Sequence, residues 1–242
     1  MTAVAVVILA GGQGSRVRHL LPEDIPKPLA VVAGRPFLEW IISLLLKEGV
    51  TEFIISSGYG GEKIAAFAAD LRARGMLARV AREDVPLGTA GGFLNALAAS
   101  QSETPLVMAC NGDSLLLSHF APLFSALADP ALDAVIAGVR VEDASRYGSI
   151  SMNAEGLLSG FNEKHAGSGL INAGLYIFRR DALRRFGEKR PLSFEFDVFP
   201  SLLEQGARIK VVPLRGPFLD IGTEETLMRA TDFIQSNREW FA

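Results

Sequence analysis

The chain has 242 residues, of which 49% are hydrophobic and 21% charged, a composition typical of a globular protein with a full core, so we expect one domain. The net charge of −3 argues against a broad nucleic-acid-binding face, which would need an excess of Lys and Arg. No apolar run approaches the ~20 residues of a membrane-spanning helix. The single cysteine, Cys110, cannot form an internal disulfide, and its apolar neighbours predict a buried, unreactive thiol. We therefore expect a cytoplasmic protein without nucleic-acid or membrane partners.

Short apolar runs alternate with helical patterns along the first 140 residues. The clearest helix covers residues 36–48, because Pro36 suits a first turn, apolar residues recur at helical spacing, and Gly49 follows the end. The apolar residues of the predicted strands are mostly continuous rather than alternating, which is typical of a sheet covered on both faces. The pattern predicts an α/β fold with a mostly parallel sheet. The strands are expected at residues 4–9, 53–56, 78–81, 106–110 and 134–137.

The pattern changes from about residue 140 onward. The segments YGSISMNAEGLLSGFNEK and GLINAGLYIF read as shorter strands joined by polar turns. They predict a small antiparallel addition over the carboxyl edge of the main sheet. No repeat or linker divides the chain, so we treat residues 1–242 as one domain. Ligands of open α/β sheets bind beyond the carboxyl ends of the strands, and we expect the functional site there.

Residues 9–28, LAGGQGSRVRHLLPEDIPKP, follow the first predicted strand at this edge. The three glycines let the backbone approach a ligand closely, and we expect the turn to lead into a helix whose first N–H groups attract an anion. Arg16 and Lys27 add charged donors, and the prolines beside Lys27 restrain its backbone. The spacing does not fit a Walker A loop, and Val17 argues against the dinucleotide fingerprint of an NAD-linked enzyme. The stretch therefore predicts a local phosphate-binding turn.

This stretch resembles the signature of the sugar-1-phosphate nucleotidyltransferases, in which a glycine turn ending in Arg and a Pro-Lys-Pro loop hold the triphosphate of an NTP. Further segments match the family in order: EDVPLGTAGG, NGD, FNEK, INAGLYIF and FLDIGTEE. The resemblance implies a Rossmann-like, mixed but mostly parallel sheet flanked by helices. Residues 1–115 would mainly bind the NTP, and residues 116–242 would mainly bind the sugar phosphate and supply a closing helix. The nucleotide-binding residues implied are Leu9, Ala10, Gly11, Gly12, Gly14, Ser15, Glu83, Leu87, Gly88 and Thr89.

Nucleotidyl transfer moves a nucleoside monophosphate onto a sugar phosphate and releases pyrophosphate. The site needs positive charge and alignment rather than a protein nucleophile, and the attacking phosphate is already ionised, so no general base is required. This is consistent with the scattered positions of His19, His119 and His165. By the resemblance, Arg16 and Lys27 would hold the leaving pyrophosphate.

Two aspartates follow predicted strands and can reach the same crevice. Asp113 comes after LVMACNG, and Asp220 comes after PFL. The resemblance implies that they hold Mg²⁺, which prefers oxygen ligands. The alternative is that each aspartate only caps a turn or a helix. Thr223, however, already suits the N-cap of the last helix, so that helix does not require Asp220.

Glu83 stands where many uridylyl- and thymidylyltransferases of the family have Gln. A carboxylate only accepts hydrogen bonds, and guanine presents two adjacent donors, whereas uracil and thymine present one donor between two acceptors. Glu83 therefore favours GTP, unless it is an exposed loop charge.

On the sugar side, the resemblance assigns sugar hydroxyls to Glu163 and Asn172, the sugar's phosphate to Lys164, and backbone contacts to Gly148. Ordinary surface and turn roles remain the alternatives for these residues.

Together with SRYGSI and LSFEFDVFP, the segments are most similar to the D-glycero-α-D-manno-heptose 1-phosphate guanylyltransferases, which supply GDP-heptose for bacterial capsule or lipopolysaccharide. The leading hypothesis is an Mg²⁺-dependent transfer from GTP to that heptose 1-phosphate, by a monomer or small homo-oligomer. The alternatives are a mannose-1-phosphate guanylyltransferase, or a uridylyl-, thymidylyl- or cytidylyltransferase of the same fold. A non-catalytic nucleotide-sensing module would be expected to lose the charged site residues, all of which are present here.

Overall fold

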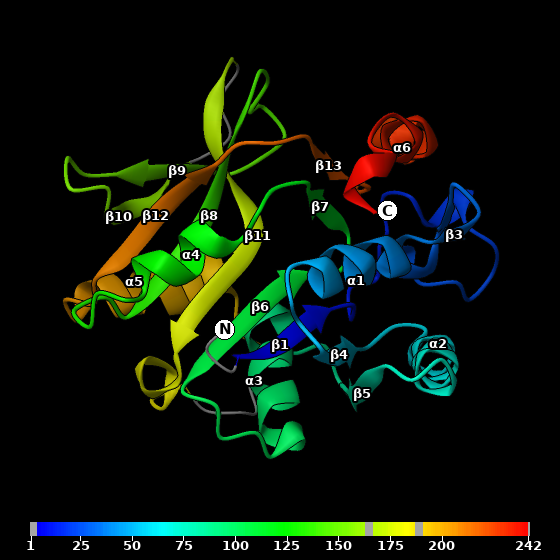
Figure 1. The fold of residues 1–242 in the computed structure, drawn as a ribbon, viewed down its shortest axis with the longest axis horizontal. Helices are drawn as coiled ribbons and strands as arrows, with labels where there is room; N and C mark the ends of the chain where they lie inside the picture. Colours follow the sequence, from blue (N-terminus) through cyan, green and yellow to red (C-terminus); the bar gives the residue numbers. More distant parts are fainter. Residues whose placement is uncertain (1–3, 163–166, 187–190, 242) are drawn as a thin grey trace.

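The structure, a computed structural model, describes residues 4–162, 167–186 and 191–241. A nine-stranded sheet with helices on both faces forms its centre (Figure 1). Four strands run parallel in the order β6-β1-β4-β5, and each contains a run that the sequence predicted as a strand. They are β1 (Val4–Leu9), β4 (Glu52–Ser57), β5 (Leu77–Arg82) and β6 (Leu106–Asn111).

The second half of the sheet is mainly antiparallel, as predicted, but it is continuous with the first. The joining strand is β11 (Gly169–Arg179), which pairs antiparallel with β8 along one edge and with β6 and, at Ile171, β9 along the other. The strand predicted at residues 134–137 belongs to this half, as β8. The remaining strands here are β8 (Ala134–Val141), β9 (Ser149–Met152), β10 (Leu158–Asn162) and β12 (Ile209–Leu214).

Helices cover both faces of the sheet, which explains the continuous apolar runs in β1, β4 and β6; the edge strand β5 alternates instead. On β1, Val6 and Ile8 pack into the core under α1, while Val7 between them packs into the opposite core with Phe93 of α3. The helix predicted at residues 36–48 is α1, which begins directly after Pro36. The helices are α1 (Phe37–Lys47), α2 (Gly61–Ala73), α3 (Gly88–Ser100), α4 (Ala121–Ala126), α5 (Phe199–Glu204) and α6 (Glu224–Ser236). None of those in the described residues is long and apolar enough to cross a bilayer.

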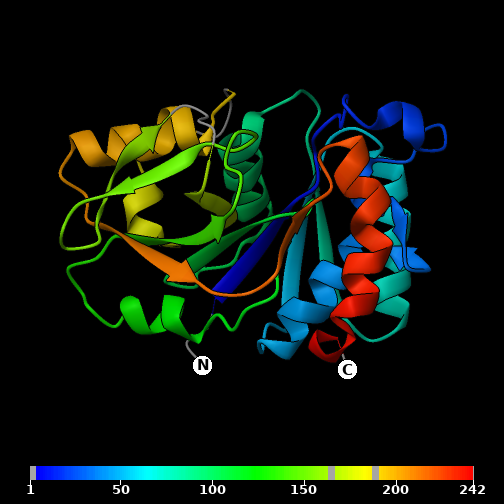
Figure 2. The same cartoon turned by 90° about the horizontal axis from the view of Figure 1, so that it is seen from above.

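The end of the chain returns to pack against the first half of the molecule (Figure 2). The Thr231 hydroxyl of α6 accepts the backbone N–H of Ala33 at 3.2 Å, and the Trp40 and Phe241 rings meet edge to face with centroids 4.9 Å apart. The Thr223 hydroxyl accepts the Thr226 backbone N–H at 3.4 Å, so the predicted N-cap of this helix is confirmed. In the segment that precedes α6, the short strand β13 (Phe218–Asp220) pairs with β7 (Ser114–Leu116), which follows the carboxyl end of β6.

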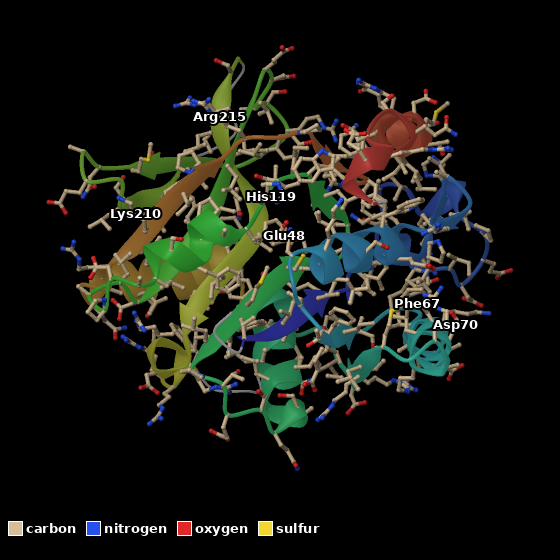
Figure 3. The ribbon with its side chains drawn as sticks, in the orientation of Figure 1. Glu48, Phe67, Asp70, His119, Lys210 and Arg215 are labelled. Atoms are coloured by element: carbon tan, nitrogen blue, oxygen red, sulfur yellow. The ribbon has the colours of Figure 1, made fainter. Side chains whose placement is uncertain are left out.

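Cys110 and the described histidines lie where the sequence indicated. Cys110 is buried, and burial, followed by the charge of Asp113, raises the pKa of its thiol to about 12. His19 and His119 are exposed, and the His119 ring contacts the Glu48 carboxylate at 2.9 Å (Figure 3). His165 lies outside the described residues.

Candidate active site

A cavity of about 680 Å³ opens at the carboxyl edge of the parallel strands. The glycine turn that follows β1 forms one wall, and the loop between β5 and α3 forms another. Asn111 and Asp113, at the end of β6, close a third side. The lining residues are Leu9, Gly11, Gly12, Gln13, Gly58, Tyr59, Arg82, Glu83, Asp84, Val85, Pro86, Gly88, Thr89, Asn111 and Asp113.

The three glycines of the turn have different surroundings. A Cβ on Gly11 would lie 2.6 Å from Oε1 of Glu83, so the protein leaves no room for a side chain at this position. Gly14 adopts φ +59°, a left-handed conformation that favours glycine. A Cβ on Gly12 would have no heavy atom within 4 Å, and this residue lines the open cavity. The backbone of Gly12 is therefore the part of the turn that a ligand can approach most closely.

The prediction that the turn leads into a helix is wrong. Residues 18–20 form only a single 3₁₀ turn. Pro22 and Pro26 follow within a few residues, and proline cannot continue a helix because it lacks the N–H donor. Any anion at this turn is thus bound by loop N–H groups and side chains rather than by a helix N-terminus.

Lys27 stands between the glycine turn and the end of β6. Its stem packs against Gly14, where a Cβ would lie 3.1 Å from the Cβ of Lys27. Its ammonium forms an ion pair with the carboxylate of Asp113, and the Lys27 side chain is only 13% exposed. Arg16 is exposed and extends over Gly222, since its Nη2 lies 3.5 Å from a Cβ placed there. Lys27 therefore contacts the Asp113 carboxylate, and Arg16 lies beside the backbone that follows Asp220.

The ladder between β7 and β13 brings Asp113 and Asp220 together. Asp220 pairs with Ser114, the residue after Asp113, and the Ile221 N–H donates to the Asp113 carbonyl at 3.0 Å. Both aspartates thus emerge beside the carboxyl end of β6, as expected from their places after strands. The described residues contain no group of three or more His, Cys, Asp or Glu suited to a metal. Two carboxylates still fit Mg²⁺, which is usually held by one or two of them together with substrate phosphates and water.

The Asp220 carboxylate has a donor on each oxygen. Oδ1 accepts the Gly222 N–H at 2.7 Å, and Oδ2 accepts the Tyr147 hydroxyl at 2.6 Å and lies 3.4 Å from Nη2 of Arg146. Burial, reinforced by this hydrogen bond to Asp220, raises the pKa of Tyr147 well above its usual range. Tyr147 therefore remains a protonated, neutral donor.

Glu83 lines the cavity, but its carboxylate is turned toward the protein. Oε1 accepts the Ser56 hydroxyl at 2.9 Å, and Oε2 accepts the Leu87 N–H at 3.1 Å. Gly11 and Gly92 leave room for this group, since a Cβ on Gly92 would lie 2.5 Å from Oε1. Glu83 thus links the end of β4 to the start of α3. The alternative of an exposed loop charge does not describe this half-buried side chain.

Gly88 and Thr89 line the cavity, whereas Leu87 is buried and its backbone is already bonded on both sides. Its N–H donates to Glu83, and its carbonyl accepts the Leu192 N–H at 2.7 Å. Gly88 adopts φ +74° and packs directly on the backbone of Leu192. Gly88 and Thr89 are therefore open to a ligand in the cavity and Leu87 is not on its lining, while the base contacts stay a prediction.

A bulge in β11 gathers polar side chains on the second half of the edge. The register to β8 shifts between Asn172 and Tyr176, and the Asn172 amide nitrogen lies 2.5 Å from the Tyr176 hydroxyl and 3.0 Å from Oε1 of Glu195. At the bulge, Gly174 adopts φ +73° and packs against the side chain of Asn111, which lines the cavity. Asn172 is therefore part of a polar cluster with Tyr176 and Glu195, while the nearby Gly174 packs on the cavity-lining Asn111. Gly148 is exposed, while Glu163 and Lys164 lie outside the described residues.

The sequence matches the family model for nucleotidyl transferase over residues 5–237. The chain belongs to the nucleotidyl transferase family. It is 32% identical over 231 residues to the mannose-1-phosphate guanylyltransferase of Mycobacterium tuberculosis, covering 94% of this chain but 64% of that protein. It is 31% identical to the D-glycero-alpha-D-manno-heptose 1-phosphate guanylyltransferase of Campylobacter jejuni, covering 90% and 95% of the two chains.

Solved structures of the nucleotidyl transferase fold agree with this assignment. HddC from Yersinia pseudotuberculosis, complexed with GMP-PN, superposes with a TM-score of 0.83 at 29% identity, covering 95% of this chain and 99% of that chain. A putative glucose-1-phosphate thymidylyltransferase from Bacillus anthracis gives a TM-score of 0.81 at 20% identity, which supports the fold alone. The predicted family and fold are therefore confirmed.

Several residues of this family member's site were not singled out by their sequence context. Tyr147 and Arg146 lie in the segment SRYGSI, which predicts a role for Gly148 alone. Glu195 lies in LSFEFDVFP, a segment that resembles the family but predicts no role for a single residue. Asn111 lies in NGD, where the predicted metal ligand is Asp113. The only signal in the sequence is that each is a polar residue within a family-like segment. Their partners, such as Asp220 for Tyr147 and Asn172 for Glu195, lie far away in the sequence.

Proposed function

We propose that this chain transfers a guanylyl group from GTP to a sugar 1-phosphate, with D-glycero-α-D-manno-heptose 1-phosphate as the favoured acceptor and pyrophosphate as the second product. The observation that carries the proposal is the grouping of Lys27, Asp113 and Asp220 beside a cavity walled by the glycine turn. Membership of the nucleotidyl transferase family agrees with this chemistry. The GDP-sugar formed would serve bacterial surface polysaccharide synthesis in the cytoplasm.

In the reaction, a phosphate oxygen of the sugar phosphate bonds to the α-phosphorus, and the bond from that phosphorus to the α,β-bridging oxygen breaks. Pyrophosphate leaves with the electron pair, and no proton transfer from the protein is required. The glycine-turn backbone, Arg16 and Lys27 would align the triphosphate and stabilise the charge that develops on the leaving oxygens. Asp113 and Asp220 would hold Mg²⁺, which supplies positive charge to the phosphate oxygens when bound. Lys164 would receive the acceptor's phosphate, and Asn172 and Glu163 would contact its hydroxyls.

Support for GTP comes from relatives and from Glu83. The relatives above are named guanylyltransferases, and the HddC structure was solved with GMP-PN. Each carboxylate oxygen has two lone-pair directions, so Glu83 can accept from guanine while keeping its bonds to Ser56 and Leu87. A uridylyl-, thymidylyl- or cytidylyltransferase is the alternative.

Relatives named for heptose 1-phosphate and for mannose 1-phosphate match at similar identity. We favour the heptose because the segments SRYGSI, GLINAGLYIF and LSFEFDVFP resemble those of the heptose enzymes. Mannose 1-phosphate is the alternative acceptor. Both sugars would meet the cluster of Asn172, Tyr176 and Glu195.

The test is pyrophosphate release from each of the common NTPs in combination with a panel of sugar 1-phosphates. We expect GTP with the heptose 1-phosphate to give the highest kcat/KM. Turnover with UTP or dTTP but not with GTP would remove the guanine assignment, and faster turnover with mannose 1-phosphate would favour the alternative acceptor. Nucleotide binding without pyrophosphate release from any pair would support a sensing module instead.

A further inference from the structure

Tyr147, a residue without a predicted role, contacts a candidate metal carboxylate. It lies in the loop between β8 and β9, and its hydroxyl donates to Oδ2 of Asp220 at 2.6 Å. Asp220 is at the end of β13, 73 residues further along the chain. The contact therefore links the sugar-side half of the sheet to the short ladder that carries both candidate metal ligands.

The tyrosine itself is held firmly in place. Its backbone N–H donates to the Ala144 carbonyl at 2.9 Å, and its ring meets the Phe218 ring edge to face at a centroid distance of 5.9 Å. The Arg146 guanidinium lies 5.6 Å from the centre of the same ring. Because the ring packing does not involve the hydroxyl, the hydrogen bond to Asp220 can be removed without removing the packing.

This hydrogen bond completes a two-point support of the carboxylate. The Gly222 N–H donates only to Oδ1. With this hydrogen bond as the sole support, the Asp220 carboxylate could rotate about it. The Tyr147 hydroxyl on Oδ2 fixes the other end, and Arg146, at 3.4 Å, is a weaker second donor on the same oxygen. The tyrosine hydroxyl is a neutral donor, and the charged partners of the two aspartates are Arg146 for Asp220 and Lys27 for Asp113. Tyr147 therefore orients Asp220 without neutralising it.

We propose that Tyr147 is a positioning residue for Asp220, which holds the carboxylate in the orientation that receives a divalent cation during the transfer. The inference rests on the proposed function, because it takes Asp220 as a metal ligand. Hydrogen-bond donors to metal-binding carboxylates fix ligand geometry, and their loss typically weakens metal affinity or activity 10- to 100-fold. Gly148, the next residue, is the predicted contact to the sugar, so one loop would support the metal ligand and the acceptor together.

The test compares wild type with Tyr147→Phe, which removes only the hydroxyl. Mn²⁺ binding is measured by electron paramagnetic resonance in the presence of GTP with a methylene group between its α- and β-phosphorus atoms, so that no turnover occurs. We expect Mn²⁺ affinity to fall by about 10-fold and the Mg²⁺ concentration for half-maximal turnover to rise similarly. The KM for GTP at saturating Mg²⁺ and the melting temperature should change little. Arg229→Ala is the control, because Arg229 lines the adjoining cavity of about 480 Å³ and pairs with Glu225 rather than with Asp220.

Two further variants separate the possible failures. If Tyr147→Phe binds Mn²⁺ as wild type does and only Tyr147→Leu weakens it, ring packing is responsible and the inference is overturned. If Asp220→Asn also leaves Mn²⁺ affinity intact, Asp220 is not a metal ligand and the inference fails with that assignment. Pyrophosphate release by the wild-type chain is measured in parallel, so loss of the proposed function is recognised separately from loss of the positioning role.

Discussion

Lys27 and Asp113 form an ion pair that joins the proline-flanked loop to the end of β6 across 86 residues of sequence. Their side chains are 13% and 31% exposed, so the pair is partly shielded from water. A triphosphate in the cavity would compete with Asp113 for the ammonium. Lys27 is therefore placed to pair with the Asp113 carboxylate before the nucleotide binds and with the leaving phosphates afterwards.

Replacing Lys27 by Met should lower kcat by at least ~10²-fold, since the charge that stabilises the developing anion is lost. Stability should change by no more than about 1 kcal/mol, because partly exposed ion pairs contribute little. Steady-state pyrophosphate release and thermal melting measure the two effects. Lys63→Met, on the exposed surface of α2, is the matched control. Parallel losses of activity and stability would make Lys27 a structural residue.

Asp113→Asn and Asp220→Asn should each reduce turnover at least ~10²-fold, because an amide is a poor ligand for a hard cation and carries no charge. Chelation should abolish wild-type turnover, and added Mg²⁺ should restore it. Asp70→Asn provides a control on the exposed face of α2 (Figure 3). Near-normal activity of either variant at saturating Mg²⁺ would remove that aspartate from the metal site.

The parts of this molecule that are readable from sequence are the local ones. The apolar run at Val4–Leu9, the start of α1 after Pro36 and the cap at Thr223 depend on residues within a few positions of each other. The family signature also located the glycine turn and both aspartates. The helix expected after the turn is absent, because Pro22 and Pro26 prevent a helix from continuing beyond the 3₁₀ turn at Arg18–Leu20.

The parts that were not readable depend on distant partners. The inward turn of the Glu83 carboxylate depends on Ser56, and the role of Tyr147 depends on Asp220. The bulge in β11 arises where Gly174 meets Asn111 from another strand. Neither the hydrophobic periodicity nor a motif within one segment predicts such contacts, because their partners come together only through the order of the strands in the sheet.

Glu83→Gln distinguishes base recognition from local support. If Glu83 accepts from guanine, kcat/KM should fall by about 10-fold or more with GTP but much less with UTP, because only guanine loses its acceptor. Some loss of stability, on the order of 1 kcal/mol, is also expected, since the amide cannot accept from both Ser56 and Leu87. Initial rates with both nucleotides and denaturant titration provide the measurements. Equal losses with GTP and UTP would leave Glu83 with the supporting role only, and Glu52→Gln on the exposed end of β4 is the control.

Gly174→Ala should destabilise the chain by about 1–3 kcal/mol, because the residue has φ +73° and its new Cβ would overlap the Asn111 side chain. Gly206→Ala is a matched control, since Gly206 has φ +78° but no heavy atom within 4 Å of a Cβ. The difference in unfolding free energy between the two variants isolates the overlap from the backbone strain. Identical values would show that the contact with Asn111 relaxes without cost.

Cys110 should make stability depend on pH in the alkaline range. Burial raises its thiol pKa from about 9.0 to about 12, so the folded state keeps the proton that the unfolded chain loses. The stabilisation is complete below pH 9 and is lost as the pH rises toward 12, by at most about 1.4 kcal/mol per pH unit. Denaturant titrations at pH 8.0, 9.5 and 10.5 should therefore show a steeper decline for wild type than for Cys110→Ala. A thiol reagent at pH 8 should react slowly with the native chain and rapidly in guanidinium chloride, and rapid native labelling would contradict the buried, protonated thiol.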